Sequence, residues 1–395
     1  MNLMRRQLGI AMAALLVVAA CGPGAATQRP ATQAPSSQAP SSQAPGSQAP
    51  ATDAPATQGA LTPVRLQLQW VTQSQFAGYF AAVDQGFYAD EGLDVEILQG
   101  AVDIVPQTVV AAGSAEFGLA WLPKVLASVE LGADLVNIAQ PFQRSGTLQV
   151  AWADSGITDP EDWRGKRVGT WGFGNEHELF AAMRKVDIDP ENEADVTIIS
   201  QDFTMDSLIA RDLDAAQAMI YNEYAQVLEA TNPDTGELYL AEDLSVISME
   251  STGTAMLQDG IFARGEWLAE EGNEDIATRF LRASFQGWVW CRDNFDHCVQ
   301  IVLDNGPTLG AGHQAWQLNE INALIWPSPA GIGMMDAAAF DRTVQVAIEG
   351  EIITAAPAEG VYRTDLTEAA WEGIEGDTTG ADYEKGDVIV TPGGE

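Results

Sequence analysis

The chain has 395 residues and a formal net charge of −37, because 56 aspartates and glutamates outnumber 19 lysines and arginines. This balance excludes nucleic acid as a partner, since nucleic-acid binding requires a basic footprint, and it argues against long-range attraction of anionic ligands. The three histidines are scattered without the spacing of metal ligands, so we expect neither a metal nor a cofactor.

Residues 1–20 have the pattern of a secretory signal peptide. Arg5 and Arg6 precede the apolar run LGIAMAALLVVAA, which is too short to span a bilayer and ends in small residues before Cys21. VVAAC resembles a bacterial lipobox, which implies that Cys21 is lipidated and anchors the protein to the extracytoplasmic face of the cell membrane. The alternative is an ordinary signal peptide followed by a coincidental cysteine.

Residues 21–61 are expected to form a disordered tether. The pentapeptides SSQAP, SSQAP, GSQAP and ATDAP carry no aromatic or large aliphatic side chains, so they cannot bury a core. The remaining chain, about 335 residues, is long enough for two modest domains or a split two-lobe fold.

The globular part begins with alternating strands and helices. Alternation of apolar residues predicts strands at 64–70, 93–100 and 115–121, and the intervening segments 76–88 and 104–113 have helical character. Further strands are expected at 147–153, 166–172, 194–200 and 214–221, with helices at 175–186 and 205–212. This order predicts α/β layering around a mostly parallel sheet, followed by a mainly helical C-terminal third.

Cys291 and Cys298 form the remaining cysteine pair, in a compartment that permits disulfides. On one unbroken helix they would lie about 10.5 Å apart along the axis and could not bond. The intervening RDNFDH is able to break the helix, so the sequence leaves the pairing open.

Four blocks in this order and spacing resemble substrate-binding proteins of ABC importers in the NMT1/THI5-like group. They are GYFAAVDQGFYADEGLDVEI, VVAAGSAEFGLAW, WRGKRVGTWG and LDAAQAMIYNEY, within roughly residues 62–350. LQWVTQSQFAGY is most similar to the riboflavin-binding lipoproteins of that group. The resemblance implies a periplasmic-binding-protein-like (type II) α/β fold, with two lobes joined by two crossover strands and a ligand cleft between them.

On this chain the resemblance implies that residues 62–150 and 260–395 form lobe 1 and that residues 151–259 form lobe 2. The crossovers are expected near TLQVAWA (147–153) and MLQDGIFA (256–263). Loops at the carboxyl ends of strands then line the cleft, where open α/β sheets bind ligands. A monomer that delivers a small molecule to a membrane permease is the expected assembly.

Aromatic residues at strand ends are candidates to sandwich a flat heterocycle. Trp70, Trp121 and Trp171 each lie where a predicted strand meets a loop, inside a family block. The expected aromatic box is completed by Phe76, Tyr79 and Tyr224.

Neutral amides accompany these rings. Gln73 and Gln75 offer both donors and acceptors to a heterocycle edge without burying a charge, and Asn222 and Glu223 face them from the other lobe. The sequence therefore favours riboflavin as the ligand, with a thiamine pyrimidine precursor of the hydroxymethylpyrimidine type as the alternative. The alternative is that these residues form an ordinary polar loop that is exposed to water and binds no ligand.

Other functions receive less support. Glu176 and Glu178 stand in the first turn of a predicted helix and disfavour a sulfonate or nitrate there. A pyrimidine synthase is disfavoured as well, because the chain lacks the cysteine cluster of those relatives, so we expect no enzymatic activity. A surface adhesin or sensor domain is not excluded.

Overall fold

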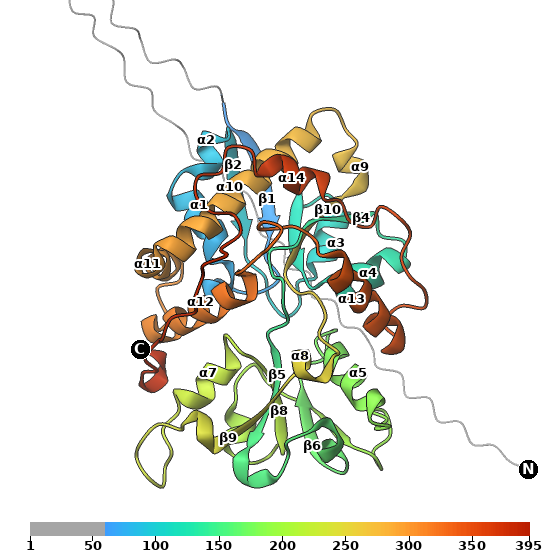
Figure 1. The fold of residues 1–395 in the computed structure, drawn as a ribbon, viewed down its shortest axis with the longest axis vertical. Coiled ribbons are helices and arrows are strands. Elements are labelled where there is room, and N and C mark those ends of the chain that lie inside the picture. The colour runs from blue at the N-terminus through green and yellow to red at the C-terminus, as the bar shows by residue number, and fades with distance from the viewer. Residues whose placement is uncertain (1–59) are drawn as a thin grey trace, which may run out of the picture. The chain divides into compact units, whose positions relative to one another are not determined.

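The computed structural model describes residues 60–395. The expected signal peptide, the lipidation site Cys21 and the tether up to residue 59 lie outside the described residues. Two five-stranded sheets organise the described part, and we refer to each sheet with its helices as the first lobe and the second lobe (Figure 1). No helix within residues 60–395 is long and apolar enough to cross a membrane.

The first lobe contains a sheet with the strand order β2-β1-β3-β10-β4. β1 pairs in parallel with β2 and β3, whereas β10 runs antiparallel between β3 and β4. Their bounds are Thr62–Gln67 for β1, Leu93–Leu98 for β2, Phe117–Ala120 for β3, Leu135–Ala139 for β4 and Gly260–Arg264 for β10.

The second lobe repeats this plan with the order β7-β6-β8-β5-β9. β6 pairs in parallel with β7 and β8, and β5 runs antiparallel between β8 and β9. Each sheet is therefore mixed, because one strand runs against its neighbours. The bounds are Thr147–Trp152 for β5, Arg167–Thr170 for β6, Thr197–Ser200 for β7, Ala215–Met219 for β8 and Leu244–Ser248 for β9.

Two segments connect the lobes, residues 140–146 between β4 and β5 and residues 249–259 between β9 and β10. Their side chains form one buried network in which Nε2 of Gln258 donates to Oγ1 of Thr147 at 2.7 Å and to Oγ of Ser145 at 3.0 Å. The backbone N–H of Met256 donates to Oε1 of Glu178 at 2.6 Å. The two connections are thus bonded to each other and to the second lobe.

Helices cover both sheets. In the first lobe α1 packs against the long helix α10, and glycines allow the close approach: a Cβ on Gly287 would clash with the carbonyl of Gly78. The first-lobe helices are α1 (Ala77–Asp84), α2 (Phe87–Asp90), α3 (Pro106–Ala111), α4 (Leu122–Glu130), α9 (Gly265–Leu268), α10 (Asn273–Asp293), α11 (Phe295–Asn305), α12 (Ala311–Ile325), α13 (Ala337–Glu349) and α14 (Asp365–Ala370). The helices of the second lobe are α5 (His177–Lys185), α6 (Asp206–Ile209) and α7 (Glu223–Leu228), and α8 (Met249–Thr252) lies in the second connection between the lobes.

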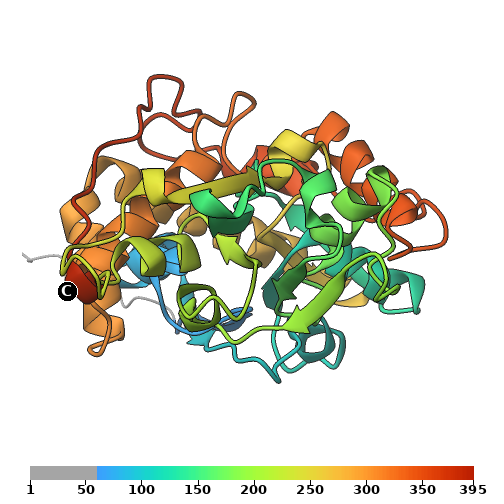
Figure 2. The same ribbon diagram turned by 90° about the horizontal axis from the view of Figure 1, so that it is seen from below.

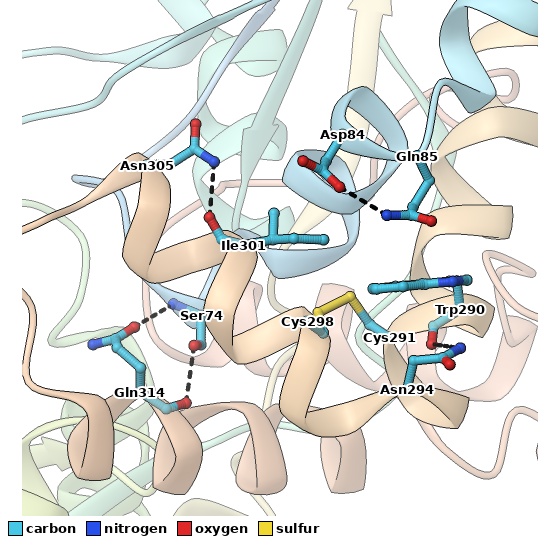
Figure 3. Close-up of a disulfide and its surroundings, with 10 residues drawn as sticks. All are labelled: Ser74, Asp84, Gln85, Trp290, Cys291, Asn294, Cys298, Ile301, Asn305 and Gln314. Atoms are coloured by element: carbon cyan, nitrogen blue, oxygen red, sulfur yellow. Dashed lines mark hydrogen bonds between the residues drawn. A yellow bond between two sulfur atoms is a disulfide. The ribbon is translucent and has the colours of Figure 1, made fainter.

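Cys291 and Cys298 form a disulfide (Figure 3). α10 ends at Asp293 and α11 begins at Phe295, so the chain turns between them and brings the two Cα atoms to 5.1 Å. The break that the sequence permitted is therefore present, and it decides the pairing that the sequence left open.

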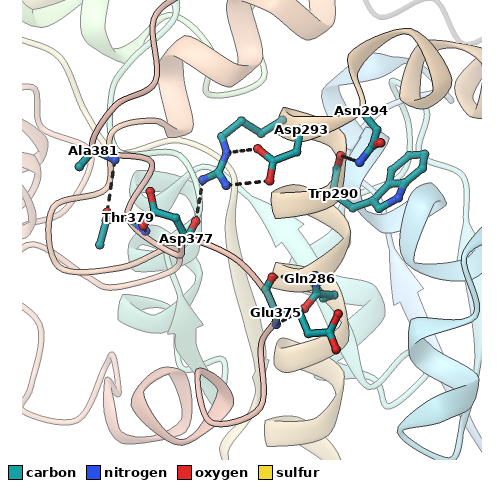
Figure 4. Close-up of polar contacts among 9 residues, drawn as sticks. Gln286, Trp290, Asp293, Asn294, Glu375, Asp377, Thr379 and Ala381 are labelled. Carbon is teal, nitrogen blue, oxygen red and sulfur yellow. Dashed lines mark hydrogen bonds and ion pairs between the residues drawn. The ribbon is translucent and has the colours of Figure 1, made fainter.

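The segment after α14 packs along α10 (Figure 4). The backbone N–H of Glu375 donates to Oε1 of Gln286 at 2.7 Å, and Nη1 of Arg292 donates to the carbonyl of Asp377 at 2.6 Å. At its end the chain reaches the second lobe (Figure 2). There the N–H of Gly393 donates to the carbonyl of Glu229 at 2.9 Å. The C-terminal segment therefore contacts both lobes.

Candidate functional site

A cavity of about 340 Å³ lies between the lobes. Its wall includes residues within three positions of the carboxyl ends of parallel strands of both sheets, namely β1 and β3 in the first lobe and β6, β7 and β8 in the second. The carboxyl ends of strands at such an edge are where open α/β sheets bind ligands. The aromatic residues in the wall are Trp70, Trp121, Trp171, Phe173, Phe203 and Tyr221.

Three of these rings form a contiguous aromatic cluster that joins the lobes. Trp70 of the first lobe lies 4.6 Å, centroid to centroid, from Phe203 of the second, at an interplanar angle of 46°. Phe203 in turn lies nearly parallel to Trp171 at 6.2 Å and 12°. Nε1 of Trp171 is buried and has no hydrogen-bond partner within residues 60–395. The cavity is thus lined by aromatic rings from both lobes.

A row of amides lies beside Trp70. Nε2 of Gln73 donates to Oε1 of Gln75 at 2.7 Å, and Nε2 of Gln75 donates to Oδ2 of Asp259, also at 2.7 Å. Nε2 of Gln69 donates to the other oxygen of the same carboxylate. Gln69, Gln73 and Gln75 all line the cavity. The amides are therefore held by one another and by a buried acid.

Helix α12 holds the loop that carries these amides. Oε1 of Gln314 accepts from the N–H of Ser74 at 2.7 Å (Figure 3). Oε1 of Gln317 accepts from the N–H of Gln75 at 3.2 Å. Oγ of Ser74 donates to the carbonyl of Gln314 at 2.9 Å. These bonds satisfy the polar backbone of a buried loop, which therefore needs no charge and little water.

The cavity also contains a lysine. Lys124 lies in the first turn of α4, with its Nζ donating to Oδ1 of Asn175 at 2.7 Å and lying 4.9 Å from the Trp121 ring centroid. Burial lowers the pKa of Lys124 to about 8, although the charges of Glu176 and Asp259 oppose that shift. At neutral pH this side chain remains mostly protonated and can donate to a ligand oxygen.

The second lobe contributes Asn222 and Glu223, which start α7. Glu223 accepts from the N–H of Met219 at 2.9 Å and from Nδ2 of Asn222 at 2.7 Å. Burial raises the pKa of Glu223 to about 7. Oδ1 of Asn222 lies 2.9 Å from Nε2 of His313 on α12, so the cavity wall is bonded across the lobes at this point.

The structure places the ten residues expected from the sequence in two environments. The cavity wall contains Trp70, Gln73, Gln75, Trp121, Trp171, Asn222 and Glu223. Phe76, Tyr79 and Tyr224 lie elsewhere: Phe76 is fully buried in the first-lobe core, Tyr79 packs edge-on against Trp288, and Tyr224 packs against Trp316. The helical turn that follows the loop directs Phe76 and Tyr79 into the core.

The sequence interpretation missed several residues of the wall. Phe203 and Tyr221 follow β7 and β8, so the same strand-end rule would have identified them. Lys124 gave no such signal, because it lies inside helix α4 rather than in a strand-end loop. Asp259 is not reached by this rule, because it belongs to a connection between the lobes rather than to a strand-end loop.

Comparison with known proteins gives consistent matches. The family described as NMT1/THI5 like matches residues 73–297. The formylaminopyrimidine-binding protein of Halalkalibacterium halodurans is 23% identical over 247 residues, which are 62% of this chain and 71% of that protein. The riboflavin-binding protein RibY of Chloroflexus aurantiacus is 24% identical over 302 residues, which are 72% of this chain and 80% of that protein.

The fold also matches solved structures. The periplasmic aliphatic sulphonate binding protein SsuA of Escherichia coli has a TM-score of 0.55 and 15% identity, over 74% of this chain and 89% of that one. At this identity the likeness concerns the fold alone. It confirms the predicted periplasmic-binding-protein fold with two α/β lobes, and the two mixed sheets agree with it.

Proposed function

The chain belongs to the NMT1/THI5 like family, and from this premise we propose that it is the solute-binding protein of an ABC importer. The relatives named above are binding proteins, and the cavity between the lobes is of the size used for small molecules, which begins at about 300 Å³. In this role the chain captures a solute outside the cytoplasm and delivers it to a permease. The protein is not an enzyme in this proposal.

Riboflavin is the ligand that we propose. The observation that carries this choice is the cluster of Trp70, Phe203 and Trp171, which brings aromatic rings from both lobes to one cavity. Each stacked pair contributes about 0.5–1.5 kcal/mol beyond the buried area. The neighbouring glutamines are neutral and can pair with the imide edge of an isoalloxazine ring without burying a further charge.

An aminopyrimidine is the second candidate. The Glu223 carboxyl lines the cavity and is only 3% exposed, so it is suited to accept from an exocyclic amine. The formylaminopyrimidine-binding relative supports this alternative. A sulfonate or nitrate is less well supported, because Lys124 shares the cavity with Glu223 and already donates to Asn175.

Attachment to the membrane belongs to the same proposal. Cys21 follows the lipobox-like VVAA, and we propose that its lipidation holds a monomeric receptor on the extracytoplasmic face of the membrane, next to its permease. Incorporation of labelled palmitate into the expressed chain, and its loss in Cys21→Ser, would test the attachment separately from ligand binding.

Fluorescence titration tests the ligand. Binding should quench riboflavin emission at micromolar protein, and Trp70→Ala should weaken the affinity about tenfold or more through loss of a stacked face. Trp290→Ala is the matched control, because that tryptophan lies on α10 outside the cavity. If riboflavin emission stays unchanged while 4-amino-5-hydroxymethyl-2-methylpyrimidine raises the melting temperature, the ligand is a pyrimidine.

A further inference from the structure

Asp259 is a buried acid directly behind the amide row of the cavity. Its side chain is 3% exposed, and its two oxygens accept from the side-chain Nε2 atoms of Gln75 and Gln69. The residue lies at the end of the second connection between the lobes, immediately before β10. One carboxylate therefore contacts two of the three glutamines of the amide row, Gln69, Gln73 and Gln75.

The backbone around Asp259 is tightly constrained. Its φ of 34° lies in the left-handed region that side chains rarely adopt, and such strain persists only where the surroundings impose it. The next residue is Gly260, where a side chain would clash with Asn137 and Gln140. The connection is thus held in a conformation that aims the carboxylate at the amides.

An ionised carboxylate can only accept hydrogen bonds, so each glutamine must present its Nε2 to Asp259. Burial raises the pKa of Asp259 to about 6, which leaves the group ionised at neutral pH. Because Gln75 gives its Nε2 to Asp259, its Oε1 is free for the Nε2 of Gln73. Within residues 60–395, Oε1 of Gln69 and Oε1 of Gln73 accept no hydrogen bond.

We propose that Asp259 is a positioning residue that sets the orientation of this amide row, so that the cavity wall presents carbonyl oxygens and selects a ligand edge with N–H donors. The inference rests on the proposed function and narrows its ligand class to rings with an imide N–H or an exocyclic amine. Asp259 acts through the glutamines and does not itself line the cavity.

Asp259→Asn tests the idea with almost no change of shape. An asparagine offers one acceptor and one donor, so only one glutamine can keep its original orientation. If Gln69 turns over, its Nε2 replaces its Oε1 at the cavity. If Gln75 turns over, its Nε2 faces Gln73, which must then turn over as well. In that case Nε2 of Gln73 replaces its Oε1 at the cavity. Either way one acceptor of the wall becomes a donor.

Binding is measured by calorimetry on the full chain with two pairs of probes. The pairs are riboflavin with 3-methylriboflavin, and 4-amino-5-hydroxymethyl-2-methylpyrimidine with its 4-methoxy counterpart, which lacks the amine. The protein should prefer the N–H member of the pair that it binds by about 10- to 100-fold, the effect of leaving one buried polar group unpaired. In Asp259→Asn the ratio of the two affinities should fall to about 1. The control is Asp134→Asn, which should keep the ratio, because the Asp134 carboxylate lies at the surface and accepts from the backbone N–H of Glu266.

Side-chain resonances give a readout that needs no ligand. In glutamine-labelled ¹⁵N protein, the Nε2–H signals of Gln69 and Gln75, assigned by their loss in Gln69→Met and Gln75→Met, should shift in Asp259→Asn. The signal of Gln85, which donates to Asp84 at the surface, should stay unchanged. Gln69→Met should also weaken binding of the N–H probe while leaving the Gln75 signal in place.

The outcomes separate the two levels of the proposal. Unmoved Gln69 and Gln75 signals overturn the positioning role, and an N–H preference that survives Asp259→Asn overturns the selectivity. If the chain binds neither probe pair, the ligand class of the proposed function is wrong, and so is the selection of ligands with N–H donors. The glutamine resonances then still decide whether Asp259 orients the amides.

Discussion

Nδ1 of His313 lies 2.9 Å from Oε1 of Glu229, and this contact joins helix α12 of the first lobe to the end of α7 in the second. Nε2 of the same ring lies 2.9 Å from Oδ1 of Asn222 in the cavity wall. One imidazole therefore bonds twice across the opening between the lobes, beside the candidate ligand site.

Removal of this imidazole should favour the open arrangement of the lobes. His313→Ala deletes both bonds, each of which contributes about 1 kcal/mol, so apparent ligand affinity should fall about 5- to 30-fold. Small-angle scattering of the unliganded variant should give a larger radius of gyration. His297→Ala, which removes an exposed histidine of α11, is the control. An unchanged radius in His313→Ala would show that the contact does not hold the lobes together.

Phe173 combines backbone strain with an exposed ring at the cavity. Its φ is 57°, and its side chain is 74% exposed although it lines the cavity. Phe173→Gly should raise the free energy of unfolding by about 1 kcal/mol, because glycine adopts this conformation without steric cost. Ligand binding should weaken, because one aromatic face of the wall is lost.

Leu240→Gly is the comparison for Phe173→Gly, since Leu240 is also exposed but has a φ of −108°. Urea unfolding should show no gain for that control. A Phe173→Gly protein that is no more stable than the parent would contradict the strain argument, and unchanged affinity would remove Phe173 from the ligand site.

Glu178 should make stability depend on pH. Burial raises its pKa to about 7 from an ordinary 4.5, so the folded protein holds this proton more tightly than the unfolded chain. Its contribution is full below pH 4.5 and is lost as the pH rises to about 7. Glu178→Gln should reduce the decline of unfolding free energy across this window by about 1 kcal/mol per pH unit.

Denaturant unfolding at pH 5, 6, 7 and 8 measures that decline. Part of it should remain in Glu178→Gln, because burial also raises the pKa of Glu223 and Asp259. Glu351→Gln removes an exposed carboxylate and should leave the full slope. Parallel curves for the parent and Glu178→Gln would mean that Glu178 does not titrate in this range.

The disulfide between Cys291 and Cys298 closes a short loop. The chain-entropy relation gives about 2.5 kcal/mol of stabilisation for a loop of this size, and its reduction should lower the melting temperature by several degrees. Calorimetry with and without a phosphine reductant checks this. The double variant Cys291→Ala, Cys298→Ala should melt at the same temperature in both buffers, and a parent protein equally insensitive to reductant would contradict the prediction.

Part of the candidate site was predictable because strand ends obey a simple rule. Parallel strands of one sheet end at the same edge, so Trp70 and Trp121 could be grouped from the sequence, and the two-lobe fold implied by the resemblance put Trp171 on the facing edge of the other sheet. The same rule would have reached Phe203 and Tyr221. It failed at Phe76 and Tyr79, because the chain there has already entered a helix whose inner face packs into the core.

Contacts between distant segments were not predictable in this way. Gln75 and Asp259 are 184 residues apart, and Asn222 and His313 are 91 residues apart. Neither pair has a local signature, because a side-chain hydrogen bond between distant segments depends on how the folded chain places those segments, within one lobe for Gln75 and Asp259 and across the two lobes for Asn222 and His313. Cys291 and Cys298 are an intermediate case. The sequence between them showed that the helix could break, but only the structure gave the distance of 5.1 Å between their Cα atoms.

The sequence by itself determined the periods of strand and helix, the family blocks and the uncharged character of the loop at residues 69–76, because these depend on neighbours along the chain. Only the tertiary structure decided which glutamine atoms face the cavity, since a carboxylate at residue 259 accepts their N–H groups. An amide alone has no preferred face. Its orientation follows from the charge that the fold buries beside it.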